Sequence, residues 1–212
     1  MADLVAAIEV HLLLAFAGLL LGLVIGLLLA LVALTSRPLA RGVYALTGIT
    51  QVVPALALAA LVVPILGIGF LPALVVVAVS TLLPIARTTY LGLMSPSAAE
   101  LDAARGIGLT PLETLRFVRI PAGMPAFFSG FRLAAVIANS VAVMTVFIGS
   151  GGLGSVVLEG LSRFYFIQVF EGALPAIALA LINDRILTHL ESRLVPPAFR
   201  ASTEIERGDP GG

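Results

Sequence analysis

Residues Ser97–Pro121, SAAELDAARGIGLTPLETLRFVRIP, decide the fold of this chain. They carry six charged side chains in a protein that is only 11% charged, and long apolar runs flank them on both sides. Ionised side chains are costly inside a membrane. We therefore expect this stretch to be a solvated connection between membrane segments, and we call residues 97–121 the elbow.

Local patterns predict two short helices within the elbow. Ser97 and Glu100 are spaced as a capping box, in which the hydroxyl accepts from the Glu100 amide and the carboxylate accepts from the Ser97 amide. Thr110 and Glu113 repeat the pattern, and Pro111 takes the first helical position, where its missing N–H costs nothing.

The segment between the two predicted helices favours a sharp bend. Gly106 and Gly108 are free to adopt backbone conformations that other residues avoid. Pro121 is expected to end the second helix. Two capped helices joined at a bend form a rigid object at the membrane surface, and its alanines 98, 99, 103 and 104 offer a small-residue surface to a partner. The alternative is an amphipathic connector that lies on lipid headgroups.

The composition is that of an integral membrane protein. Of its 212 residues, 59% are hydrophobic, and the mean hydropathy is +1.12. A soluble domain of this size needs far more polar surface. The formal net charge is zero, which gives no basic field for nucleic acid. Without cysteine, the chain can form neither disulfides nor thiol-based sites.

Apolar runs predict an all-α protein with five membrane-spanning helices, at about residues 12–34, 44–63, 71–90, 126–148 and 166–187. The first run of 23 residues spans about 34 Å as a helix. Gly18, Gly22 and Gly26 lie four residues apart on it and either admit a closely packed neighbour or reflect ordinary glycine usage in membrane helices. Residues 1–200 are interpreted as one transmembrane domain and 201–212 as a disordered tail.

Basic residues predict the orientation in the membrane. If successive helices cross in alternate directions, nearly all arginines fall on one side, and only Arg163 falls on the other. Arg132 can snorkel to that same side from within the fourth helix, and Asp184 with Arg185 is interpreted as an interfacial anchor there. The positive-inside rule then puts the N-terminus outside and places the elbow and the C-terminus in the cytoplasm.

No set of side chains predicts catalysis or metal binding. His11 and His189 lie on opposite membrane faces, so they cannot share a metal or a triad. The glycine-rich segment 149–154, expected to be a loop, has no lysine and lies on the external side, which excludes a phosphate-binding loop. We therefore expect no ATP site and no catalytic residue in this chain.

Polar groups inside the predicted helices are candidates for a translocation pathway. Such groups in hydrocarbon either line a cavity or form hydrogen bonds between helices, worth about 0.6 kcal/mol each. Both interpretations stay open at this point. The candidates are Gln51, Pro54, Asn139, Ser140 and Thr145.

The elbow resembles a known family. Asp102-Ala103-Ala104-x3-Gly108-x9-Val118-x-Ile120-Pro121 is similar to the Glu-Ala-Ala-x3-Gly-x9-Ile-x-Leu-Pro signature of permease subunits of binding-protein-dependent ABC importers. The chain departs from it mildly at residues 102, 118 and 120. The resemblance covers roughly residues 12–190 and implies a type I importer permease fold, in which the elbow is a coupling helix region that docks on the ATPase. The docking residues it implies are Glu100, Asp102, Ala103, Ala104, Arg105, Gly106, Gly108, Thr110, Pro111 and Pro121.

A narrower resemblance concerns the solute. Several segments are similar to osmoprotectant permeases for glycine betaine, choline or carnitine: Gln51–Pro54, Leu66–Phe70, Leu83–Gly92, Ala103–Pro111 and Ile148–Gly154. Methionine-type permeases share the five helices and the last glycine loop, so they remain the alternative. Trimethylammonium groups are usually held by aromatic faces. Because this chain has no tryptophan and only 7% aromatic residues, the affinity site is expected on a separate binding protein.

The resemblance also implies the partners and the location. The chain would lie in a bacterial cytoplasmic (inner) membrane, surrounded by lipid, and pair with a second copy or a close homologue. Two ATPase subunits would hold ATP and Mg, an extracytoplasmic binding protein would deliver the solute, and this chain would bind no cofactor. An ion-coupled secondary transporter and a non-transporting scaffold are the competing classes. The first needs an acidic group at mid-membrane, which the five runs do not clearly offer.

Overall fold

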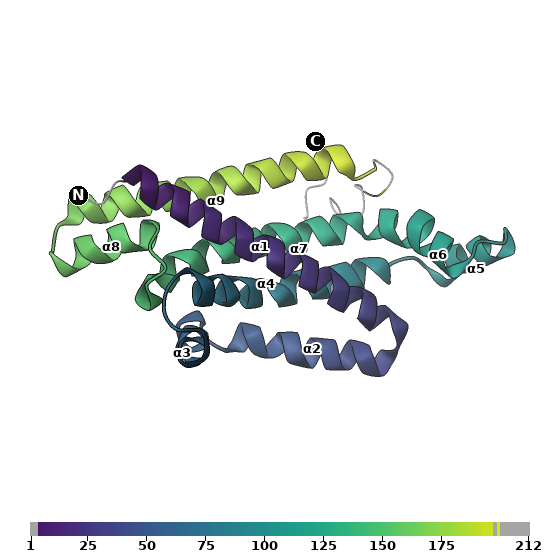
Figure 1. The fold of residues 1–212 in the computed structure, drawn as a ribbon. Helices are drawn as coiled ribbons and strands as arrows, with labels where there is room; N and C mark the ends of the chain where they lie inside the picture. Colours follow the sequence, from purple (N-terminus) through teal and green to yellow (C-terminus); the bar gives the residue numbers. More distant parts are fainter. Residues whose placement is uncertain (1–3, 197–198, 200–212) are drawn as a thin grey trace.

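The computed structural model describes residues 4–196 and residue 199, and over these residues the chain is helical without any strand. The predicted disordered tail at 201–212 lies outside the described residues. Figure 1 shows elongated helices side by side, with the elbow at one end of the bundle. The helices are α1 (Leu4–Thr35), α2 (Arg37–Val52), α3 (Ala55–Leu66), α4 (Phe70–Leu93), α5 (Ala98–Gly106), α6 (Pro111–Thr114), α7 (Ile120–Met144), α8 (Leu153–Ser162) and α9 (Phe166–Leu194).

Four of the five predicted spans are confirmed as long apolar helices. Within the described residues, the segments long and apolar enough to cross a membrane are α1, α4, Pro111–Ile148 and α9. The predicted ranges 12–34, 71–90, 126–148 and 166–187 all lie inside them. Each helix is longer than its predicted apolar run, because helical hydrogen bonding continues into the polar ends.

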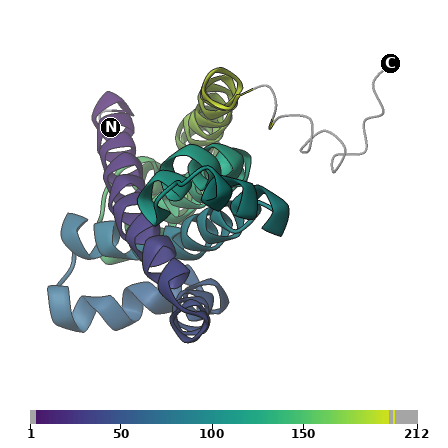
Figure 2. The ribbon, with the colours of Figure 1, turned by 90° about the vertical axis from the view of Figure 1, so that its right-hand side faces the viewer.

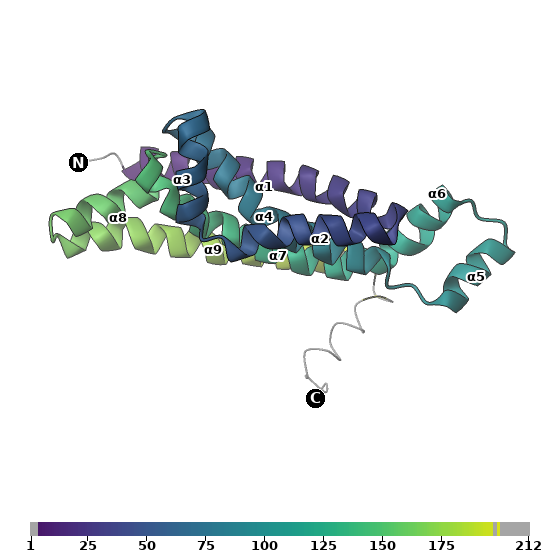
Figure 3. The same cartoon turned by 90° about the horizontal axis from the view of Figure 1, so that it is seen from below.

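The second predicted helix, at 44–63, is wrong in its bounds and its continuity. Helix α2 already begins at Arg37, seven residues before the predicted start, because Ser36 caps it by accepting from the Leu39 amide at 3.3 Å. The helix ends at Val52, and Val53 is extended because Pro54 disfavours helical geometry in the residue before it. Helix α3 then crosses one end of the bundle at a steep angle to α2 (Figure 3).

Close packing of α1 on α4 depends on the glycine stripe. A Cβ atom added to Gly18 would lie 2.7 Å from Val77 Cβ, and one added to Gly26 would lie 2.8 Å from Ile85 Cγ2. At Gly22 the same atom would collide with Thr81 Oγ1. The interpretation of the stripe as a site of close helix approach is therefore confirmed.

Helix α4 packs equally closely on α7 through a second set of glycines. A Cβ atom on Gly130 would lie 2.7 Å from the Pro84 carbonyl oxygen, and one on Gly92 would lie 2.7 Å from the Gly123 carbonyl oxygen. Helix α4 thus lies between α1 and α7 and is the most buried of the long helices, whereas α9 is the least buried. Figure 2, seen from the elbow end, shows α9 at the edge of the bundle.

The sequence did not predict helix α8. The loop expected at 149–154 is real as far as Gly152, and Gly149, Gly151 and Gly152 all have φ between 74° and 77°. Leu153, however, already begins a ten-residue helix that packs along α9. Its buried residues Leu153 and Val156 join Ala176 of α9 in one apolar cluster.

The α1–α4 contact leads to a first prediction. Gly22→Ala should lower the free energy of unfolding by about 1–3 kcal/mol, because the new methyl group has no room beside Thr81. Gly42→Ala is the matched control, since Gly42 is also helical but faces open space, and it should raise the stability by about 0.5–1 kcal/mol. Equilibrium unfolding of the purified protein in mixed detergent and SDS measures both. Equal effects of the two substitutions would contradict the close contact.

Candidate functional site

The elbow lies outside the bundle at the end opposite α8 (Figure 3). Helix α5 forms its first arm, and a turn at residues 107–109 leads to α6. Gly108 has φ +83°, in the left-handed region that favours glycine, so the predicted bend is confirmed there. Gly106 instead forms the last residue of α5.

Both predicted capping boxes are present. Glu100 Oε2 accepts from the Ser97 amide at 2.7 Å, while Ser97 Oγ accepts from the Glu100 amide at 3.3 Å. Glu113 Oε2 accepts from the Thr110 amide at 2.8 Å, and Thr110 Oγ1 accepts from the Glu113 amide at 3.3 Å. Two reciprocal hydrogen bonds therefore fix the start of each helix, as the sequence pattern indicates.

The caps also set the electrostatics of the elbow. Hydrogen bonds from the Ser97 hydroxyl and then the Ser97 amide hold the pKa of the Glu100 carboxyl below its usual value. The hydroxyl and amide of Thr110 do the same for the pKa of Glu113. A lowered pKa means that the caps stabilise the folded elbow fully above the usual glutamate pKa. This stabilisation is lost as the pH falls through the lowered values.

The second arm of the elbow corrects the predicted end at Pro121. After α6, the chain passes through a π-helical turn, Leu115–Arg119, directly into α7, so this arm is continuous with a spanning helix. Ile120 N donates to Leu115 O in the wider spacing of that turn. Pro121 follows this π turn, and the helix continues through it into α7.

The two ends of the elbow are joined at its base. Arg119 Nη1 donates to the Leu93 carbonyl oxygen at 2.8 Å, at the C-terminus of α4. The tight Gly92–Gly123 contact lies beside it. The sequence did not reveal this role, because nothing local distinguishes Arg119 from the other surface arginines. The bond holds the start of the elbow against its end.

The outer surface of the elbow is partly apolar. Ile107, Leu112 and Phe117 are 77%, 74% and 59% exposed, and all three precede the predicted span at 126–148. Of the predicted alanine surface, 98, 99 and 103 are exposed but Ala104 is buried. Asp102 and Arg105 form an exposed ion pair at 3.0 Å. The elbow therefore presents apolar groups on a rigid support, as a docking element does.

The candidate pathway residues lie in three different places. Asn139 is buried on α7, where its Nδ2 donates to the Ala176 carbonyl oxygen and its Oδ1 lies 3.1 Å from His11 Nε2. Ser140, beside it, is exposed, and both residues line a cavity of about 390 Å³ between α7, α8 and α9. The structure therefore brings together Asn139 and Ser140.

The other three candidates lie apart from this pair. Gln51 Nε2 donates to the Ser80 carbonyl oxygen at 2.9 Å, beside the break at Pro54. Thr145 is buried and donates to the Ser150 hydroxyl at 2.9 Å, which fixes the start of the glycine loop. These hydrogen bonds are of the structural kind that the sequence left open as the alternative.

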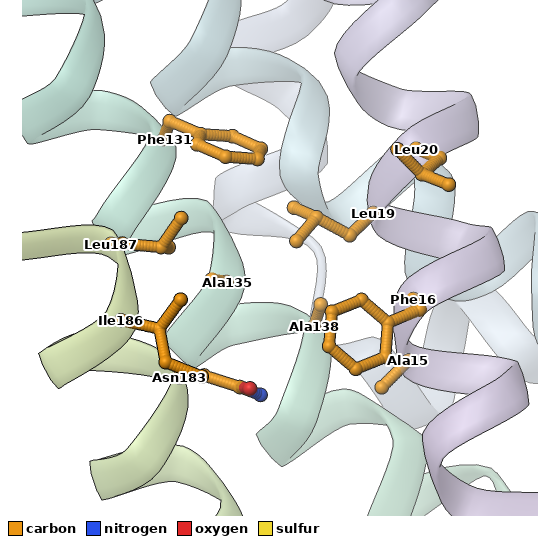
Figure 4. Close-up of a pocket in the computed structure, with 10 residues that line it drawn as sticks. All are labelled: Ala15, Phe16, Leu19, Leu20, Phe131, Ala135, Ala138, Asn183, Ile186 and Leu187. Atoms are coloured by element: carbon orange, nitrogen blue, oxygen red, sulfur yellow. The ribbon is translucent and has the colours of Figure 1, made fainter. Parts of the chain in front are cut away.

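Two further cavities lie along α9. One, of about 160 Å³ between α1, α7 and α9, is lined by nine apolar side chains and the amide of Asn183 (Figure 4). The other lies beside an ion-pair network in which Arg132 bonds Asp184 at 2.9 Å and Glu191 at 3.4 Å. Arg132 therefore does not simply snorkel, and Asp184 binds α7 rather than serving only as a surface anchor. Among the described residues, no three His, Cys, Asp or Glu side chains are grouped to hold a metal ion.

Comparison with known sequences points in one direction. Residues 22–196 match the family described as binding-protein-dependent transport system inner membrane component. The chain is 35% identical to an osmoprotectant import permease protein of Salmonella typhimurium, over 92% of this chain and 83% of that protein. It is 32% identical to a carnitine transport permease protein of Listeria monocytogenes, over 92% and 89% of the two chains. A choline transport system permease protein of Bacillus subtilis is 31% identical, over 92% and 90%.

Comparison with solved structures identifies the fold. A chain of the MetNI methionine ABC transporter in an inward-facing conformation superposes with a TM-score of 0.79 at 23% identity, over 92% of this chain and all of that one. A chain of an amino acid ABC transporter gives a TM-score of 0.77 at 19% identity, over 90% and 94%. At these identities the likeness shows the fold alone.

The independence of the two capping boxes can be tested by titration. Ser97→Ala removes the hydroxyl that lowers the pKa of Glu100, so this pKa should rise toward its usual value. The pKa of Glu113 should stay unchanged, because its own partner Thr110 is intact. Carbon-13 NMR of labelled glutamate carboxyls in the detergent-solubilised protein measures both, and Thr110→Ala should give the reverse result. A Glu100 carboxyl that titrates normally in the unsubstituted protein would contradict the box.

Proposed function

The chain belongs to the family of binding-protein-dependent transport system inner membrane components, and from this premise we propose that it is the permease subunit of an ATP-driven ABC importer for a quaternary-ammonium osmoprotectant. Glycine betaine, choline and carnitine are the candidate solutes, because relatives of 31–35% identity over most of the chain carry the names of such transporters. The chain would be the multi-pass transport subunit in the inner membrane, and ATP hydrolysis would be carried out by a partner ATPase rather than by this chain.

One observation carries this proposal, namely the doubly capped elbow that extends beyond the bundle. A connector lying on lipid needs no fixed bend, whereas this one is held by two capping boxes and by the bond from Arg119 to Leu93. Ile107, Leu112 and Phe117 offer apolar anchors on that support. We assign it as the coupling element that docks on the ATPase. The proposed docking residues are Glu100, Asp102, Ala103, Ala104, Arg105, Gly106, Gly108, Thr110, Pro111 and Pro121.

We further propose five membrane crossings with the N-terminus outside and the C-terminus in the cytoplasm. Helix α2 follows α1 and precedes α4 in the sequence, and it lies along the bundle. Successive long helices run in opposite directions (Figure 1). Helix α2 would make most of the remaining crossing, and α3, which lies at a steep angle to it, would lie at the outer end of that crossing (Figure 3). The arginine distribution supports this orientation by the positive-inside rule.

The proposed assembly contains a second copy or a close homologue, two ATPase subunits and an extracytoplasmic binding protein. ATP and Mg would bind to the ATPase subunits, and this chain would hold no cofactor. Closure of the ATPases would move the elbows, and rigid-body motion of the permeases would open the pathway to one side at a time. Of the candidate pathway residues, Asn139 and Ser140 are supported by the cavity that they share.

Two alternatives are distinguishable from this proposal. A methionine or other amino-acid permease would share the fold, as the solved structures do, but their lower identity favours the osmoprotectant reading. An ion-coupled secondary transporter would take up solute without ATP and stop when the ion gradient is collapsed. Purification of the intact complex from native membranes, followed by an ATPase assay, separates an ABC importer from a secondary transporter, and the solute that loads the co-purified binding protein separates the osmoprotectant reading from the amino-acid reading. An ATPase partner stimulated by a loaded binding protein supports the importer, and an intact assembly without ATPase contradicts it.

The elbow yields a prediction for transport. Gly108→Glu should abolish transport while the permease remains in the membrane, because a bulky charged residue is strained at φ +83° and distorts the bend that the ATPase contacts. Gly42→Glu adds the same charge at an open helical position of α2 and is the matched control. Solute uptake into proteoliposomes, normalised to the amount of permease, measures both. Full transport by the Gly108 variant would argue strongly against the coupling role.

A further inference from the structure

A charged cavity lies on the exposed face of α7, in the half of the bundle that is nearer the elbow. It has a volume of about 300 Å³ and is lined by Ser129, Arg132, Leu133, Val136 and Asp184. Four of these residues come from α7 and one from α9. The cavity therefore follows the seam between these two helices, and we call it the seam cavity.

The ion-pair network at the seam cavity carries one more negative charge than positive charge: Arg132 and Asp184 line the cavity, and Glu191 lies behind Arg132. Arg132 Nε and Nη2 both lie 2.9 Å from Asp184 Oδ1, and Arg132 Nη1 lies 3.4 Å from Glu191 Oε2. One guanidinium thus faces two carboxylates. The side chain of Asp184 is 36% exposed, against 23% for Arg132 and 15% for Glu191, so Asp184 is the acid that a solute can reach. Arg185 follows on α9 but does not line the cavity.

The same seam continues into the cavity that contains Asn139 and Ser140. Ser129, Leu133, Val136 and Ser140 follow one another at helical spacing along the outward face of α7. The α9 side of the seam is formed by small and apolar residues as far as Asp184. Ionisable groups within spanning helices face the bundle interior or a water-filled space, because exposure to lipid is costly. This face therefore belongs toward water rather than hydrocarbon in the assembled transporter.

We infer that the seam cavity is a transit site for a quaternary-ammonium headgroup, with the Asp184 carboxylate as its counter-charge. This inference rests on the proposed function and names residues for it. Leu133 and Val136 supply apolar walls against which the methyl groups can pack. Among the described residues that line the cavity, none is aromatic, so it lacks the cation–π contacts that give tight binding. Weak binding suits a site that a solute must leave.

The competing explanation is that Arg132, Asp184 and Glu191 only tie α7 to α9. A structural tie would depend on the pairing between the three side chains and be indifferent to the charge of the solute. A transit site depends on the net charge of this three-residue network, which a solute in the cavity would experience. Charge-selective probes therefore separate the two explanations.

The first experiment measures the cavity charge without transport. Because the chain has no cysteine, Ser129→Cys places a unique thiol on the cavity wall. In the full complex, 2-(trimethylammonium)ethyl methanethiosulfonate should modify Cys-substituted permease faster than the sulfonatoethyl reagent does. Adding Asp184→Asn should lower this rate ratio about tenfold, since one unit of negative charge near the thiol is removed. Glu171→Gln, an exposed acid of α9 outside both cavities, should leave the ratio unchanged.

Two results of that experiment would overturn the inference. One is a rate ratio that Asp184→Asn leaves unchanged. The other is a thiol at position 129 that neither reagent modifies in a complex that hydrolyses ATP. Modification is followed by mass spectrometry of this chain, so cysteines of the partners do not interfere.

The second experiment measures transport of choline and glycine betaine into proteoliposomes. Asp184→Asn should lower kcat/KM for the cation choline about tenfold, and lower that for the zwitterion glycine betaine less. The double variant Arg132→Gln/Asp184→Asn leaves Glu191 as the single charge and should recover choline transport. A double variant no better than the single one would favour the structural tie and overturn the inference. If the unsubstituted transporter carries neither solute, the proposed function fails, and the reagent ratio still decides whether the cavity selects cations.

Discussion

Close backbone contact between α1, α4 and α7 is the constraint on which the rest of the molecule depends. Apolar side chains gain little from leaving lipid for a helix interface, so membrane helices associate through tight packing. Here Gly22 admits Thr81 on one side of α4, and Gly130 admits the Pro84 carbonyl on the other. A side chain at either glycine would separate two helices that together hold the core. Helix α4 is therefore fixed between its neighbours, and both of its ends are positioned by them.

The elbow is rigid because both of its ends are attached to that core. Its first arm begins a few residues after α4 ends, and its second arm continues into α7 without a break. The base is closed where Gly92 meets Gly123 and Arg119 bonds the Leu93 carbonyl oxygen. Because both arms are capped as well, the elbow itself deforms little when a force acts on it. It is instead transmitted to α4 and α7, and through Arg132 to α9.

Features that depend on neighbouring residues could be predicted from the sequence, whereas contacts between distant residues could not. The capping boxes at Ser97 and Thr110 and the bend at Gly108 depend on neighbouring residues, so spacing alone predicted them. Pro54 lies inside the helix predicted at 44–63, but whether a proline bends or splits a helix depends on tertiary packing, and here it splits one. Pro121 failed as a stop because a π turn precedes it. Asp184, which pairs with Arg132, and Ala176, whose carbonyl accepts from Asn139, lie 52 and 37 residues away on α9, whose packing no local pattern encodes.

The distribution of packing suggests where motion is easiest. Helix α9 is the least buried of the long helices, and polar bonds cross its contact with α7, from Asn139 to Ala176 and from Arg132 to Asp184 and Glu191. Interdigitated glycine contacts fix a distance, whereas an ion pair tolerates small shifts and can exchange partners. The same seam contains the two cavities whose linings include polar side chains of α7. A movement that leaves the α1–α4–α7 core intact can therefore still reshape the seam, because the bonds that cross it are the ones that a charged solute can compete for.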